Sequence, residues 1–256
     1  MVVFALIHNL ALLVALSVVS GFVEHHWRDT PRGSLLQGLL FGGVAVVGML
    51  NPFVPRPGLI FDGRSVVVSL CGLFFGPLAV LMAAGATAIC RGLQGGVGAV
   101  TGTLVILASA LWGVGFHRHW TRRGKDPAAL ELGVFGLLVH GTMLLLMLTL
   151  PGGVGKTVLE RIGLPVMVAY PLATVLLGRV LSDQRSRARL LRELQEEQGR
   201  LHSYLDGAPM GIFLADQGGR CVQVNPEACR VTGYDEGELL GRDFTDLLAP
   251  ESREMG

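Results

Sequence analysis

Charged side chains are scarce in the first 181 residues of this 256-residue chain. That segment has 12 Lys and Arg and 6 Asp and Glu, whereas residues 182–256 have 9 and 14. Half of all residues are hydrophobic, and the mean hydropathy is +0.52. The composition indicates an integral membrane domain followed by an acidic soluble tail. It lacks the strongly basic character of a nucleic-acid-binding protein, so we expect no nucleic acid among its partners.

Cysteine is scarce as well. Cys71 and Cys90 lie in apolar sequence, and Cys221 and Cys229 lie in the acidic tail. None of the four has the spacing of a metal-binding or disulfide motif. We therefore expect free thiols, and the sequence predicts neither a metal site nor a cofactor.

The first apolar run, Val2–Val23, lacks the features of a cleaved signal peptide. No basic segment precedes it, and it contains His8 and Asn9. The next residues, Glu24–Arg28, are charged or aromatic instead of the small residues of a cleavage site. We predict that this run is retained as a membrane span.

Six apolar runs approach or exceed the roughly 20 residues that a helix needs to cross a bilayer. They are Val2–Val23, Leu35–Leu50, Ser65–Cys90, Val97–Phe116, Leu130–Leu150 and Ile162–Leu181. The third run contains Gly76-Pro77, and proline removes a helix hydrogen bond and clashes with the preceding turn. An unbroken third helix gives six spans, and a break gives seven, which we favour. Both arrangements keep the basic loop His117–Lys125 cytoplasmic, together with the C-terminal tail of a multi-pass protein of the inner (cytoplasmic) membrane.

Two arginines, Arg64 and Arg91, bracket the third run. An arginine at membrane depth costs about 2.5–3.5 kcal/mol on insertion scales, so such a residue usually faces a cavity, a partner charge or a ligand. If the run folds back at Gly76-Pro77, both guanidinium groups reach the same side and can hold one carboxylate. We predict a site for a small anion. The alternative is structural pairing with Asp62 or with carbonyls at a broken helix.

Further polar groups surround this predicted site. Arg91 is followed by the glycine-rich segment Gly92–Gly98, whose backbone N–H groups either hold an anion or belong to a flexible loop. His140 lies in an apolar run, where it either lines the same cavity or makes a helix–helix hydrogen bond. The predicted ligand-binding residues are Arg64, Arg91, Asp62, Asn51, Gln94, Gly95, Gly96 and His140, and we predict no catalytic residue.

The segment 182–204 is rich in charge but keeps a heptad pattern. The a and d positions are Val180, Leu190, Leu194, Leu201 and Tyr204, with Arg187 and Glu197 as poor members. The pattern predicts a continuous helix that leaves the membrane and forms a parallel coiled-coil homodimer. The alternative is a solvated linker helix.

The period then changes to that of short strands. Gly211–Asp216 and Arg220–Asn225 are predicted strands joined by a turn at Gln217–Gly219. Asn225-Pro226 is a predicted helix start, because asparagine caps the first turn and proline is tolerated there. Glu236–Leu240 and Thr245–Leu248 suggest two more helical turns.

At these residues the tail resembles a PAS domain. The matching segments are Leu205–Ile212, Asp216, Asn225–Ala228, Thr232–Tyr234, Glu238–Arg242 and Asp246–Leu248. The resemblance covers the first half of such a domain, so we expect a truncated α+β PAS fragment over residues 205–256. A two-stranded sheet is marginally stable by itself.

The membrane part resembles the LytS-type five-transmembrane sensor domain over about residues 34–181. The matching residues are Asn51, Pro57-Gly58, Phe61–Ser65, Leu73–Gly76, Arg91–Gly98 and Thr101-Gly102. That family supplies input modules of histidine kinases and diguanylate cyclases, and its members are associated with sensing small carboxylates or envelope conditions. The chain has neither a kinase histidine box nor a Gly-Gly-Asp-Glu-Phe motif, so we expect a sensory fragment without catalytic activity.

The predicted fold is an all-α polytopic membrane bundle, with residues 1–181 as sensor, 182–204 as signalling helix and 205–256 as PAS fragment. The predicted function is a receptor that binds a small anion, such as a pyruvate-like carboxylate, and signals through the dimeric helix to an output enzyme. Membrane lipid is the other expected partner. The alternative is a small-molecule transporter or substrate-capture subunit resembling the binding subunits of vitamin importers, because those share a helix–Gly-Pro–helix layout.

Overall fold

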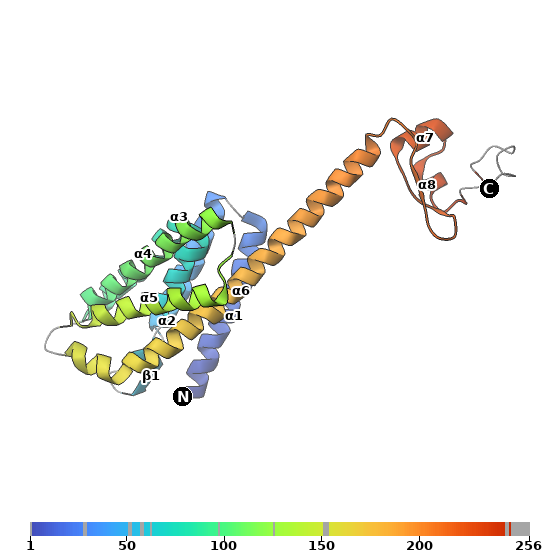
Figure 1. Cartoon of the computed structure of the whole chain (residues 1–256). Helices are drawn as coiled ribbons and strands as arrows, with labels where there is room; N and C mark the ends of the chain where they lie inside the picture. The colour runs from blue at the N-terminus through green and yellow to red at the C-terminus, as the bar shows by residue number, and fades with distance from the viewer. Residues whose placement is uncertain are drawn as a thin grey trace. The chain divides into compact units, whose positions relative to one another are not determined.

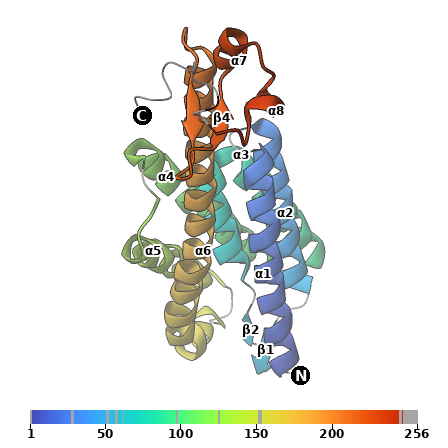
Figure 2. The ribbon, with the colours of Figure 1, turned by 90° about the vertical axis from the view of Figure 1, so that its right-hand side faces the viewer.

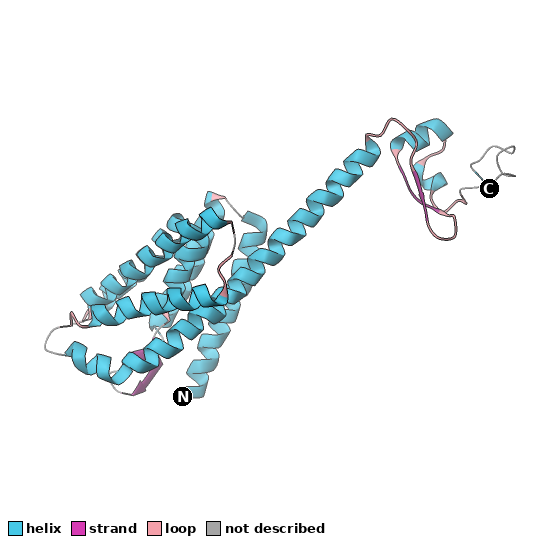
Figure 3. Ribbon diagram, viewed as in Figure 1, coloured by secondary structure: helices cyan, strands magenta, loops and turns pink. Residues whose placement is uncertain are grey.

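The structure is a computed structural model that describes residues 2–27, 30–50, 53–56, 59–61, 63–96, 98–124, 126–150, 154–243 and 246. The side chains of residues 2–14, 53–56, 59–61, 154, 158 and 161 are not part of the description. Helices predominate, and the described strands form two short hairpins (Figures 1 and 3). The helices are α1 (Val2–Trp27), α2 (Pro31–Leu50), α3 (Arg64–Gln94), α4 (Ala99–Arg123), α5 (Ala129–Met147), α6 (Val154–Asp206), α7 (Pro226–Thr232) and α8 (Glu236–Leu239).

The chain divides into two compact units, Met1–Ala188 and Arg189–Gly256. The first unit is a helical bundle, and α6 is one continuous helix that runs through the boundary. The predicted continuous helix after the membrane domain is therefore confirmed. Among the residues with described side chains, five helices are long and apolar enough to cross a membrane. These are α2, α3, α4, α5 and the Ile162–Asp206 part of α6.

The third helix is folded back on itself at Gly76. This residue has φ 80° and ψ −169°, which is not helical, and Pro77 follows it. A Cβ atom placed on Gly72 would lie 3.2 Å from a methyl group of Val80. Eight residues of straight helix span about 12 Å, so this contact requires the two arms to lie side by side. The unbroken helix of the six-span alternative is therefore not formed.

Helix α2 runs beside the second arm of α3. A Cβ atom on Gly38 would lie 2.4 Å from the carbonyl oxygen of Ala79, and one on Gly42 would lie 3.0 Å from Cα of Ala83. The residue numbers rise together, so α2 and this arm are parallel. Small residues at a spacing of four allow such close approach between helices.

The two ends of the bundle differ in the functional side chains that lie there. The turn at Gly76 lies near the end of α1, the start of α2 and Arg185 of α6, which together line one cavity. We call this the Gly76 end. Arg64 and Arg91 lie 12 and 15 residues from Gly76, or about 18 and 22 Å along their arms. Both therefore lie toward the opposite end of the hairpin, which we call the arginine end.

A two-stranded sheet precedes α3. Strands β1 (Phe53–Arg56) and β2 (Leu59–Phe61) pair antiparallel, with Phe53 opposite Phe61. Figure 2 shows both strands at the end of the bundle where α1 begins. The sequence did not predict this hairpin, because its proline and glycine content is typical of a loop.

The second unit begins within α6 and contains the PAS fragment. Strands β3 (Phe213–Ala215) and β4 (Cys221–Val224) pair antiparallel, and α7 and α8 follow. Both predicted strands, the turn between them and the helix start at Asn225-Pro226 are confirmed. The predicted turn at Thr245–Leu248 lies outside the described residues, except for Asp246.

Asn225 holds this fragment together with four hydrogen bonds. Its Oδ1 accepts from the N–H groups of Ile212 and Ala228 at 2.8 and 2.9 Å. Its Nδ2 donates to the carbonyl oxygens of Leu205 and Met210 at 2.9 and 3.0 Å. Leu205 belongs to the last turn of α6, so one buried amide joins the helix to the strand pair and to α7.

Substituting Gly76 tests the fold-back. Gly76→Ala should destabilise the bundle by about 1–3 kcal/mol, since this backbone conformation is nearly restricted to glycine. A Cβ there would also lie 2.9 Å from Nε2 of His117. The matched control is Gly85→Ala on the second arm, where a Cβ has nothing within 4 Å. Thermal unfolding of the detergent-solubilised chain measures both, and equal midpoints would contradict the fold-back.

Removing the Asn225 side chain tests its role in the PAS fragment. Asn225→Ala leaves four backbone groups without this partner, at about 1–3 kcal/mol for each that stays buried and unsatisfied. Hydrogen exchange measured by mass spectrometry should then accelerate in peptides covering 205–228 and stay unchanged in the bundle. Gln223→Ala, at a half-buried position of β4, is the control. Unchanged exchange in the Asn225 variant would show that the amide is dispensable.

Candidate functional site

Arg91 lies near the end of the second arm of α3, in a site shaped by glycines. One terminal nitrogen, Nη1, donates to the carbonyl oxygen of Gly95 at 3.2 Å and contacts Oε1 of Gln94 at 3.4 Å. Its Nε is buried and has no hydrogen-bond partner within the described part of the chain. A Cβ on Gly102 of α4 would lie 2.7 Å from this Nε. Because Gly102 has no side chain, the guanidinium group of Arg91 can pack directly against the backbone of α4.

The segment after Arg91 forms a tight turn. Gly95 and Gly96 have φ values of 63° and 85°, a region that favours glycine. Gln94, the last residue of α3, donates from Nε2 to the carbonyl oxygen of Met49 at 3.2 Å. Arg91, Gln94, Gly95 and Gly96 thus form one cluster at the arginine end, beside the end of α2. The sequence predicted these four residues together.

His140 lies in the bundle interior and is fully buried. Its Nδ1 lies 2.7 Å from the carbonyl oxygen of Gly136, so Nδ1 is the donor. In the neutral ring Nε2 is then an acceptor, and Oγ of Ser65 donates to it over 3.2 Å. The ring also stacks on Tyr170 of α6 at a centroid distance of 5.1 Å. The helix–helix hydrogen bond that the sequence allowed is present.

Arg64 is the first residue of α3 and is half-buried. It directly precedes Ser65, so it lies one residue from the His140 contact. Arg64 is thus next to the His140 contact, and Arg91 with its turn lies toward the same end of the α3 hairpin. Asn51 and Asp62, the other two predicted ligand-binding residues, lie outside the described residues.

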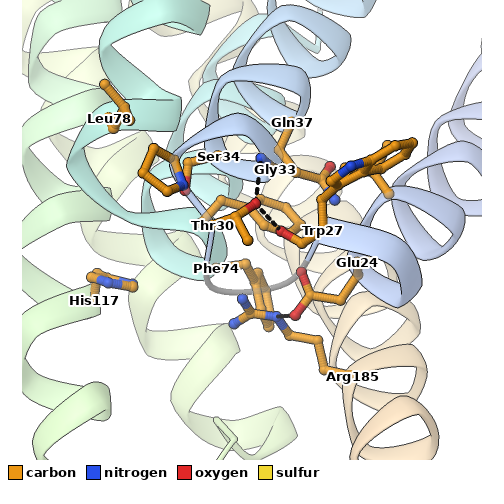
Figure 4. Close-up of a pocket in the computed structure, with 13 residues that line it drawn as sticks. Glu24, Trp27, Thr30, Gly33, Ser34, Gln37, Phe74, Leu78, His117 and Arg185 are labelled. Carbon is orange, nitrogen blue, oxygen red and sulfur yellow. Dashed lines mark hydrogen bonds and ion pairs between the residues drawn. The ribbon is translucent and has the colours of Figure 1, made fainter.

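A separate cavity of about 380 Å³ lies at the Gly76 end, where sequence reasoning did not place one. Figure 4 shows its lining residues, which come from α1, α2, α3, α4 and α6. Nε of Arg185 lies 3.1 Å from Oε1 of Glu24, in an ion pair between α6 and α1. One feature of the sequence could have pointed to this cavity. Glu24 is one of only six acidic residues in the first 181 positions, and a rare carboxylate in an apolar segment needs a partner.

Comparisons with known proteins identify both parts of the chain. The family model described as 5TMR of 5TMR-LYT matches residues 16–184, well over half of the chain. The chain belongs to the 5TMR-LYT family. The model of the PAS fold matches residues 199–255. A search of curated proteins and a search of solved structures each found no match.

The 5TMR-LYT match covers the arginine end and all but one of the residues that line the cavity at the Gly76 end. It includes Arg64 and Arg91 at the arginine end, and it extends to residue 184, next to Arg185 at the Gly76 end. The predicted arrangement of a LytS-type sensor domain followed by a PAS domain is confirmed. With its apolar helices, this arrangement makes the chain a sensory input module of a membrane protein.

Proposed function

We propose that this sensory module is a receptor for a small anion, a carboxylate of about the size of pyruvate, which binds at the arginine end. A conformational change of the α3 hairpin then passes through α6, as a dimer, to the PAS domain and an output enzyme. The parent protein is a histidine kinase or a diguanylate cyclase of the inner membrane, with the PAS domain in the cytoplasm.

One observation carries the anion proposal. The buried Nε of Arg91 has no partner among the described residues, although the same guanidinium group already donates through Nη1. A buried donor without a partner costs about 1–3 kcal/mol, and more when it is charged. A carboxylate removes that cost, because its two oxygens match the planar donor fork of arginine.

Arg64 supports the same site from the other arm of the hairpin. The fold-back directs both arms toward the arginine end, and the two arginines differ by only three residues in their distance from Gly76. A ligand held by both arms would couple them. Such a ligand changes the angle or separation of the arms only through a difference in affinity between two arrangements.

The relay uses the uninterrupted helix α6. Leu190, Leu194, Leu201 and Tyr204 are all more than half exposed in the single chain. These are the heptad positions that a second parallel copy would cover. At the end of α6, the carbonyl oxygen of Leu205 accepts from Asn225, so a shift of the helix is passed on to the strand pair.

A transporter would explain the α3 hairpin but would leave the C-terminal tail unexplained. The fold-back at Gly76 is the observation that favours it, because broken helices line substrate sites in many transporters. A continuous helix leading to a PAS fold has no role in moving a solute. The receptor therefore accounts for more of the chain.

Calorimetry with pyruvate tests the anion site on the purified chain. Arg91→Ala should abolish binding while leaving thermal unfolding nearly unchanged, because the side chain packs against glycines. Arg64→Lys should weaken binding despite its retained charge, since lysine cannot reproduce the two-pronged geometry. Arg179→Ala, on the exposed face of α6, is the control. If both variants bind pyruvate or another confirmed carboxylate with wild-type affinity, these arginines are structural.

Light scattering of the chain in detergent tests the dimer. Leu194→Lys puts a charge into the proposed seam and should weaken the dimer by a few kcal/mol. Gln195→Lys, at the next residue and outside the a and d positions, adds the same single positive charge and is the control. A mass that is unchanged by Leu194→Lys would mean that α6 does not hold the two copies together.

A further inference from the structure

The cavity at the Gly76 end has the chemistry of a cation site. Its lining includes the carboxylate of Glu24, which is 6% exposed, and the rings of Phe74 and Phe75. The guanidinium carbon of Arg185 lies 5.0 Å from the ring centre of Phe75 and 5.6 Å from that of Phe74. A carboxylate beside aromatic faces attracts cations, through its charge and through the ring quadrupoles. Arg185 is thus an internal ligand of this site.

A second acceptor in the lining is not satisfied. Gln37 is 2% exposed, and its Nε2 donates to the carbonyl oxygen of Ser20 at 2.8 Å. That contact fixes the orientation of the amide, because a carbonyl oxygen accepts only from the nitrogen. Its Oε1 is buried without a hydrogen-bond partner in the described part of the chain. A donor entering the cavity would remove the cost of this unpaired acceptor.

We propose that the Gly76-end cavity binds a small organic cation with N–H donors, an amine or guanidine on a short carbon chain. The cation replaces Arg185 at Glu24 and donates to Oε1 of Gln37, while its carbon chain lies against the phenylalanine rings. A cavity of about 380 Å³ lies within the range of sites for small molecules. Replacement keeps the local charge balanced, because one cation leaves the carboxylate as another arrives.

Binding would act on the signalling helix. The Glu24–Arg185 pair joins α1 to α6, and the rings under Arg185 immediately precede the turn at Gly76. Displacing Arg185 therefore loosens α6 from both elements. This site differs in charge and position from the anion site at the arginine end, so the proposal does not rest on that function.

Titration calorimetry with n-butylguanidinium tests the proposal on the full chain in phosphatidylglycerol nanodiscs. We expect saturable binding that n-butanol and butyrate do not reproduce. Glu24→Gln should weaken it by about tenfold or more, because it removes the negative charge, and Gln37→Leu should weaken it several-fold, because it removes an acceptor. Arg185→Ala should tighten binding by roughly tenfold, since the internal competitor is gone. A gain of affinity cannot result from a misfolded variant.

The matched controls are Arg179→Ala and Asp183→Asn, which alter an exposed ion pair on the same helix. Both should leave the affinity for n-butylguanidinium unchanged. The proposal is overturned if neither the wild type nor Arg185→Ala binds n-butylguanidinium, because water alone would then fill the cavity. Equal affinity in Glu24→Gln would overturn it as well.

The cation can be a soluble amine or the ammonium group of a phosphatidylethanolamine headgroup. Repeating the titration in discs that contain phosphatidylethanolamine distinguishes them. Loss of apparent affinity for n-butylguanidinium in those discs identifies the headgroup as the competitor. An unchanged affinity identifies a soluble cation, and both results support the site if Glu24→Gln weakens the binding.

Discussion

The fold of α3 back on itself is the constraint on which the rest of the bundle depends. It is possible because Gly76 adopts a backbone conformation that nearly every other residue avoids, and because Pro77 cannot continue the helix of the first arm. The turn lets α2 run parallel to the second arm and leaves both arginines toward one end. It also puts Phe74 and Phe75 beside Arg185 of α6. This single turn therefore determines which side chains lie at each end of the sensor domain.

Scarcity of charge gives each charged group in the bundle a large effect. An ion in an apolar bundle needs a partner, and three such groups illustrate different solutions. Glu24 pairs with Arg185 across two helices. Glu131, at the start of α5, accepts from Trp120 and Arg123 of α4 and so closes the basic loop. Within the described part of the chain, the buried Nε of Arg91 has no hydrogen-bond partner, and this is why Arg91 is the centre of the proposed anion site.

In the proposed receptor, helix α6 couples the bundle to the PAS fragment. Helix α6 contains Pro165 and Pro171, but no proline lies between Arg185 and Leu205, where backbone hydrogen bonds hold each turn to the next. The helix contacts Glu24 at one position and Asn225 twenty residues later, through Arg185 and Leu205. In this proposal, a change at either contact reaches the other through the helix, although each unit has its own core.

The sequence by itself determined the local features. Long apolar runs predicted the helices, Gly76-Pro77 predicted the break, and Asn225-Pro226 predicted the helix start in the PAS fragment, because each depends on backbone preferences and near neighbours. The cluster at Arg91 was predictable for the same reason, since its partners follow within five residues. Only the tertiary structure decided which distant residues meet. The contacts Ser65–His140 and Glu24–Arg185 are separated by 75 and 161 positions. Such pairs depend on how helices pack, which the periodicity of one segment does not specify.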